Sequence, residues 1–225
     1  MVIDHNHPYI KRLHNQPGFQ KNRYNGAYYY SKEIAKFFIP YIKTDRNWVT
    51  INVPKEALPH AIVFAHNNVH LEWYEKYKGL DPVFVCGMPE TAERLKMYGE
   101  TIYLPLSIDT EYVSKFRTEK TKEACFVGRR EKLNDAVPKN IDILESMPRP
   151  ALLAELARYR KAYAVDRCAI EAKCLGCEVI PYGYGYGVVH PVDFWKVIDS
   201  RDAAKMLQKK LNEVDHEDTE KDQRV

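Results

Sequence analysis

The residues best suited to chemistry lie in the second half of the chain, in two polar stretches that follow apolar ones. The first is Glu171, the carboxylate within the mostly apolar helical stretch RCAIEAKCL. A carboxylate about one turn into a helix can accept hydrogen bonds from paired hydroxyl groups, such as those of a ribose. The start of that helix, at Asp166 and Arg167, presents backbone N–H groups to an anion. The alternative is a solvent-exposed Glu171 that pairs with a neighbouring lysine.

The second polar stretch is the basic turn FVGRREK, which follows an apolar run. Gly128 lets a ligand come close to the backbone. Three cations follow it: Arg129, Arg130 and Lys132. Guanidinium groups bind phosphate oxygens through two parallel hydrogen bonds, and a lysine adds a compact charge. A diphosphate between this turn and the helix start would therefore meet cations on one side and N–H groups on the other. The alternative is a solvated charge cluster.

A tyrosine-rich segment, NRYNGAYYYSKEI, leads into the first expected helix. Gly26 permits close approach of a ligand to the backbone, and Tyr28 and Tyr29 could stack on a sugar or a base of an acceptor. The alternative is that these tyrosines pack the helix against its sheet. Lysines and arginines nearby would also suit a nucleic-acid acceptor.

The pair Cys174 and Cys177 has the spacing of a redox or zinc motif. However, it stands at the end of an expected helix and the chain has no second such pair. A redox thiol is favoured at a helix start, and a zinc site needs further ligands. The pattern therefore predicts two buried cysteines beside a helix-capping glycine.

These residues belong to alternating short apolar runs and longer helical ones, which predicts an α/β fold with mainly parallel sheets. The expected strands span residues 48–53, 61–66, 82–87, 101–106, 124–128, 161–166 and 178–183. The expected helices span residues 31–42, 71–78, 89–99, 149–160, 167–175 and 200–211. Pro40 should end or bend the first of these helices.

The polar stretch between the two series of strands predicts a domain boundary near residue 109. We expect one small Rossmann-like domain over residues 1–109 and another over 110–211, followed by a charged, disordered tail over 212–225. In such sheets, ligands bind beyond the carboxyl ends of the strands.

Composition limits the classes of function. The 225 residues carry 34 Lys and Arg against 31 Asp and Glu, a net charge of +3, which permits an anionic ligand without the strong positive charge of a dedicated nucleic-acid binder. No run approaches the roughly 20 apolar residues that span a bilayer. Five cysteines, several of them in apolar runs, favour a reduced, cytoplasmic setting.

Several motifs together resemble GT-B glycosyltransferases, closest to the retaining family 4 type (glycosyl transferases group 1) that includes sucrose and glycogen synthases. In the second half these are VGRREK and EAKCLGCEVI. In the first half, IVFAHNN, VFVCGMPETAERL and TIYLPLSIDTEYV are similar to the family's N-terminal half. Residues 105–109, PLSID, stand at the family's P-x-G-I-D linker. The likeness spans residues 51–189.

The resemblance implies two Rossmann-like domains that face each other across a cleft, with a nucleotide-diphosphate sugar as the donor. It assigns the diphosphate to the basic turn and the ribose to Glu171, and it places His66 beside the donor sugar. In inverting members of this fold, a histidine or aspartate after the first strand acts as general base. Here that role would fall to Asp4, His5 or His7, unless these residues form a solvent-exposed terminus.

Two functions of different class remain open. The first is a glycosyltransferase that needs neither a metal ion, since the chain has no Asp-x-Asp motif, nor a tightly bound cofactor. Its acceptor would be a glycan, a small molecule or modified DNA, the last by analogy with some bacteriophage enzymes. The second is a binding module for a nucleotide or nucleotide sugar, favoured by Tyr163, which stands where the family has a second glutamate. A nucleic-acid-binding protein is a further alternative.

Overall fold

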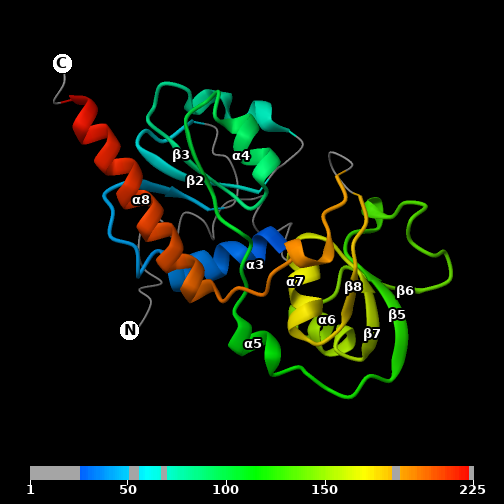
Figure 1. Ribbon diagram of the computed structural model, residues 1–225. Helices are drawn as coiled ribbons and strands as arrows, with labels where there is room; N and C mark the ends of the chain where they lie inside the picture. Colours follow the sequence, from blue (N-terminus) through cyan, green and yellow to red (C-terminus); the bar gives the residue numbers. More distant parts are fainter. Residues whose placement is uncertain (1–25, 51–55, 67–69, 184–187, 223–225) are drawn as a thin grey trace. The chain divides into compact units, whose positions relative to one another are not determined.

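The computed structural model describes residues 26–50, 56–66, 70–183 and 188–222, with the backbone alone for residues 26–28, 131 and 216–222. The chain forms two compact units (Figure 1). Unit 1 comprises Ser31–Pro105 and the segment from Ser200 onward, and unit 2 comprises Leu106–Asp199 together with the residues up to Tyr30 that begin the first helix. The division at Pro105 lies close to the expected boundary at residue 109, whereas the last helix joins the first unit.

Unit 1 is built on a four-stranded, wholly parallel sheet in the order β1-β2-β3-β4. The strands are β1 (Asn47–Val49), β2 (Ala61–Ala65), β3 (Val83–Cys86) and β4 (Glu100–Tyr103). Every residue of β2 and β3 is buried, because strands in the middle of a parallel sheet are covered on both faces. The continuous apolar runs AIVFA and VFVC are the sequence signature of that burial.

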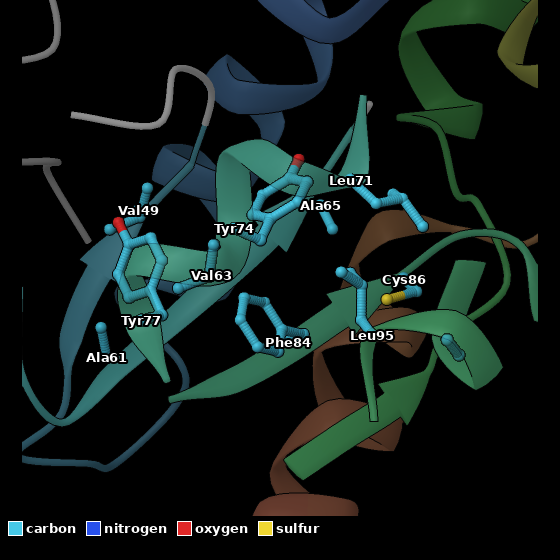
Figure 2. Packing of buried hydrophobic residues seen from close by; sticks show 11 residues of the cluster. Val49, Ala61, Val63, Ala65, Leu71, Tyr74, Tyr77, Phe84, Cys86 and Leu95 are labelled. Atoms are coloured by element: carbon cyan, nitrogen blue, oxygen red, sulfur yellow. The ribbon is translucent and has the colours of Figure 1, made fainter. Parts of the chain in front are cut away.

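Aromatic packing anchors the core of unit 1. The 3-10 helix η2 (Leu71–Tyr77) and helix α4 (Pro89–Leu95) connect the strands and contribute to this core. Figure 2 shows Tyr74 and Tyr77 of η2 beside Phe84 of β3, with ring centroids 5.7 and 5.9 Å apart in edge-to-face geometry. Such pairs stabilise beyond the area that they bury.

In unit 1, the last helix packs against the π-helix that continues the first helix. Helix α3 (Gly26–Glu33) continues as the π-helix η1 (Ile34–Phe38) and ends before Pro40, where the helix was expected to stop or bend. Helix α8 (Ser200–Asp222) packs against η1 and β4. We expected a disordered tail from residue 212, but α8 continues to Asp222, and Asp215 lies 3.1 Å from the buried guanidinium of Arg46.

Unit 2 contains the second parallel sheet, in the order β6-β5-β7-β8. Its strands are β5 (Lys122–Val127), β6 (Asp142–Leu144), β7 (Tyr159–Tyr163) and β8 (Glu178–Ile180). Helices α6 (Arg149–Leu156) and α7 (Asp166–Cys174) pack on β7, and α7 also contacts β8 (Figure 1). Helix α5 (Thr110–Ser114) contacts α7. Two four-stranded parallel sheets, each with helices between its strands, confirm the α/β class and are consistent with a Rossmann-like fold.

Lys120 holds the ends of two helices in unit 2. Its ammonium donates to the carbonyl oxygens of Ala157 at 2.9 Å and Leu175 at 2.8 Å, the residues that cap α6 and α7 at their C-termini. A cation is favoured there, because the last carbonyls of a helix lack partners and carry partial negative charge. Gly176 follows with φ +81°, the left-handed conformation that ends many helices.

Among the described residues, no helix is both long and apolar enough to cross a membrane.

Candidate functional site

The candidate site lies at the carboxyl edge of the sheet in unit 2, where the strand order reverses. The chain leaves β5 toward β6 on one side and leaves β7 toward β8 on the other. Loops that diverge in this way create the usual ligand position of an open α/β sheet. The basic turn follows β5, and the start of α7 follows β7. The two stretches singled out in the sequence therefore leave neighbouring strands at the same edge.

Gly128 opens the basic turn in a conformation that favours glycine. Its φ is +150°, and a β-carbon at this position would lie 3.4 Å from the ring of Phe126. Its backbone N–H donates to the carbonyl of Leu144, at the end of β6, at 3.1 Å. The turn thus begins tied to the neighbouring strand.

The cations of the turn are held by carboxylates from the neighbouring strand ends. Arg130 donates to Glu145 twice, from Nε at 2.7 Å and from its backbone N–H at 3.0 Å. Lys132 Nζ lies 2.8 Å from Asp166 Oδ2, at the start of α7. Arg129, between Gly128 and the short 3-10 helix η3 (Arg130–Lys132), is exposed. Three predicted site residues, Arg130, Lys132 and Asp166, therefore take part in two ion pairs at this edge, Arg130 with Glu145 and Lys132 with Asp166.

The start of α7 has an unusual backbone. Asp166 adopts φ +56°, which is rare for a residue other than glycine, although aspartate tolerates it better than most. The preceding residue, Val165, has no polar side chain with which to cap the helix. The carboxylate of Asp166 is 31% exposed and faces Lys132.

Glu171 is completely buried and pairs with two arginines. Arg149, the first residue of α6, donates from Nη1 to Oε2 at 2.8 Å and from Nη2 to Oε1. Arg167 Nη2 lies 3.5 Å from the same carboxylate and donates from Nη1 to the carbonyl of Ser107 at 2.8 Å. The alternative of an exposed Glu171 paired with a lysine is wrong. Contact with a ribose stays a prediction.

Two tyrosines of α3 lie against these arginines. The guanidinium carbon of Arg149 is 5.0 Å from the ring centroid of Tyr29, and that of Arg167 is 5.1 Å from the ring of Tyr30. The backbone N–H of Arg149 also donates to the hydroxyl of Tyr29 at 3.3 Å. In this structure Tyr29, predicted to bind an acceptor, contacts a protein cation. The sequence did not single out Arg149 as a site residue. Pro150 indicates that a helix starts there, which places Arg149 at a helix start but does not identify its partner.

The remaining candidates divide between described and masked parts of the chain. His66 follows β2 and donates from Nε2 to the carbonyl of Thr50 at 2.6 Å. Gly26 is the first residue of α3. The side chain of Tyr28 and the residues Asp4, His5 and His7 lie outside the part that the structure describes.

Cys174 and Cys177 are both buried free thiols, as predicted. Burial raises the pKa of each thiol, which keeps it protonated and unreactive at neutral pH. Within the described ranges, no group of three or more histidine, cysteine or acidic side chains has the arrangement of a metal site.

Comparisons with protein-family models, with curated proteins and with solved structures find no match to this chain.

Proposed function

We propose that unit 2 binds the diphosphate of a nucleotide sugar and that the protein is a glycosyltransferase. The observation that carries the proposal is the 2.8 Å contact between Lys132 and Asp166. This contact joins the basic turn to the start of α7, and the sequence predicts anion binding for each of these two stretches. Both belong to strand ends where open α/β sheets bind their ligands.

The chemistry of this edge suits a departing nucleotide. Glycosyl transfer from a nucleotide sugar leaves negative charge on the diphosphate, and preorganised cations stabilise that charge. Arg129 and Arg130 can offer planar guanidinium forks, and Lys132 a compact charge. Backbone N–H groups at the start of α7 add partial positive charge.

The buried ion pairs give Glu171 a supporting role in the proposal. Arg149 engages both of its oxygens, and the carboxylate has no exposed surface. We propose that Glu171 holds Arg149 and Arg167 in place behind the start of α7. A direct bond to a ribose would require the Arg149 pair to open. The proposal also includes the two-domain GT-B arrangement, with the acceptor assigned to unit 1. Asp4, His5 and His7 are its candidate general bases, and His66 is the candidate residue beside the donor sugar.

The proposal is tested by calorimetric titration of the full chain with uridine, guanosine, adenosine, cytidine and thymidine diphosphates. We expect one of them to bind and Lys132→Met to weaken it by about tenfold or more, the loss of a charge-assisted contact. Lys115→Met is the matched control, because Lys115, which follows α5 in the same unit, has a side chain that is 65% exposed. If no diphosphate binds, or if both variants bind like the unmodified protein, the site is not a diphosphate site.

A binding module without turnover is the second candidate. Tyr163, the last residue of β7, stands where the GT-B family pattern has a second glutamate, so a carboxylate expected near the donor sugar is missing. Release of free nucleoside diphosphate from the matching nucleotide sugar, stimulated by an acceptor, separates the two candidates. An acceptor panel that includes oligonucleotides would reveal a DNA-modifying transferase, whose acceptor binding should weaken steeply as salt rises.

A further inference from the structure

We infer that Asp166 is an internal counter-anion of the diphosphate site: its carboxylate neutralises Lys132 until a ligand with at least two negative charges displaces it. The inference rests on the proposed function and concerns which anions this edge accepts.

The contact between Asp166 and Lys132 is short and partly shielded from water. Nζ and Oδ2 are 2.8 Å apart, and the side chains are 14% exposed for Lys132 and 31% exposed for Asp166. Asp166 also stands at the first position of α7, where the helix dipole attracts negative charge. The Asp166 carboxylate therefore supplies a negative charge at the position where the proposed site would bind the negative charge of a phosphate.

A ligand phosphate and Asp166 compete for the same cation. Two anions that share one ammonium group repel each other at the short distances involved. The ammonium of Lys132 has three donors and can reach both anions, but their mutual repulsion favours the state in which the phosphate has displaced Asp166. The Lys132–Asp166 ion pair therefore weakens the binding of an anionic ligand. In this inference Asp166 does not act as a hydrogen-bond acceptor for a hydroxyl group of the ligand.

This competition depends on the charge of the ligand. A singly charged anion replaces one negative charge on Lys132 by another, so the exchange gives little net attraction. A diphosphate brings further charge that Arg129 and Arg130 can meet. The ion pair of Arg130 with Glu145 is easier to exchange, because the Arg130 side chain is 66% exposed and water screens the pair. The site should therefore discriminate pyrophosphate from a singly charged phosphate ester such as dimethyl phosphate.

Asp166→Asn is the decisive variant. Asparagine preserves the size of the side chain, tolerates the left-handed backbone at this position, and removes only the negative charge. Glu111→Gln is the matched control, because Glu111 is also an acidic residue in the first turn of a helix of unit 2, but it is 68% exposed and pairs with Lys115. Both variants change the net charge of the protein equally.

The experiment is calorimetric titration of the full chain and both variants with inorganic pyrophosphate and, separately, with dimethyl phosphate, which carries a single negative charge. Far-UV circular dichroism and melting curves first check that each variant is folded. We expect pyrophosphate to bind Asp166→Asn about tenfold more tightly than the unmodified chain, with Glu111→Gln unchanged. We also expect the preference of the unmodified chain for pyrophosphate over dimethyl phosphate to shrink in Asp166→Asn.

The outcomes separate the inference from the function on which it rests. If the unmodified chain binds pyrophosphate and Asp166→Asn binds it equally or more weakly, Asp166 is no competitor, while the diphosphate site stands. Equal gains in both variants would reveal a general charge effect and overturn the inference in the same way. If pyrophosphate binds none of the three proteins and no nucleoside diphosphate binds, the site and the inference fall together.

Discussion

Replacing Glu171 should expose the energetic importance of the buried ion pairs. In Glu171→Gln the side chain keeps its size, but the bidentate contact with Arg149 needs two acceptors and an amide offers one. The amide nitrogen would then face guanidinium donors, and two buried cations would lose the carboxylate that they share. Removing one partner of a buried ion pair costs about 3–5 kcal/mol. Because a folded domain is stable by only about 5–15 kcal/mol, this loss should be easy to measure.

Urea unfolding followed by circular dichroism measures the total effect, and hydrogen exchange of the α7 amides reports on unit 2 alone. The second readout matters because two compact units can unfold separately. Glu123→Gln is the control: Glu123 is 69% exposed and pairs with Lys161 at the surface, so its loss should cost at most about 1 kcal/mol.

The double variant Arg149→Met with Glu171→Leu gives the sharper test. It removes one positive and one negative charge together, so the net charge of the buried cluster is the same as in the unmodified chain. Replacing a whole buried pair by apolar side chains is often nearly neutral. We therefore expect the double variant to be more stable than Glu171→Gln. If Glu171→Gln unfolds within about 1 kcal/mol of the unmodified chain, or the double variant is the less stable of the two, the reasoning is refuted.

Two further predictions concern stability. Lys120→Met should lower the free energy of unfolding by about 2 kcal/mol, because the C-terminal carbonyls of α6 and α7 lose a charged donor. Urea unfolding measures this loss, with exposed Lys115→Met as the control. Equal losses in the two variants would contradict the prediction. The hydrogen bond to the Asp81 carboxylate, with a smaller contribution from Asp45, raises the pKa of His60 above its ordinary 6.5 and outweighs the opposing effect of burial. Since the raised pKa belongs to the folded state, the stabilisation is complete below pH 6.5 and is lost as the pH rises through the folded pKa. NMR titration of the His60 ring should give a midpoint above 6.5, and His60→Asn, which tolerates the φ of +48° there, should flatten this part of the pH profile; a midpoint at or below 6.5 would contradict it.

The elements of the fold were largely accessible from the sequence. Continuous apolar runs such as residues 61–65 and 83–86 are typical of strands in a sheet that is covered on both faces. These two runs form β2 and β3. Boundaries were less accessible. β7 begins at Tyr159, inside a stretch expected to be helical, because pairing with β5 determines where the strand starts.

The sequence also placed the candidate site at a strand end, since Gly128 and the cations after it follow an apolar run. The alternation of strands and helices along the chain likewise predicted a helix start after β7. What it left open was the partner of each charge. Glu171 looked equally suited to solvent, a lysine or a ligand, and the structure pairs it with Arg149, 22 residues away in the chain.

Likewise, only the tertiary structure brings Lys132 to Asp166, 34 residues further on, and joins α8 to the first unit. The physical reason is that local patterns report whether a residue is buried and in which kind of element. The pairing of charges depends instead on the order of strands in a sheet, and in unit 2 that order, β6-β5-β7-β8, differs from the order along the chain.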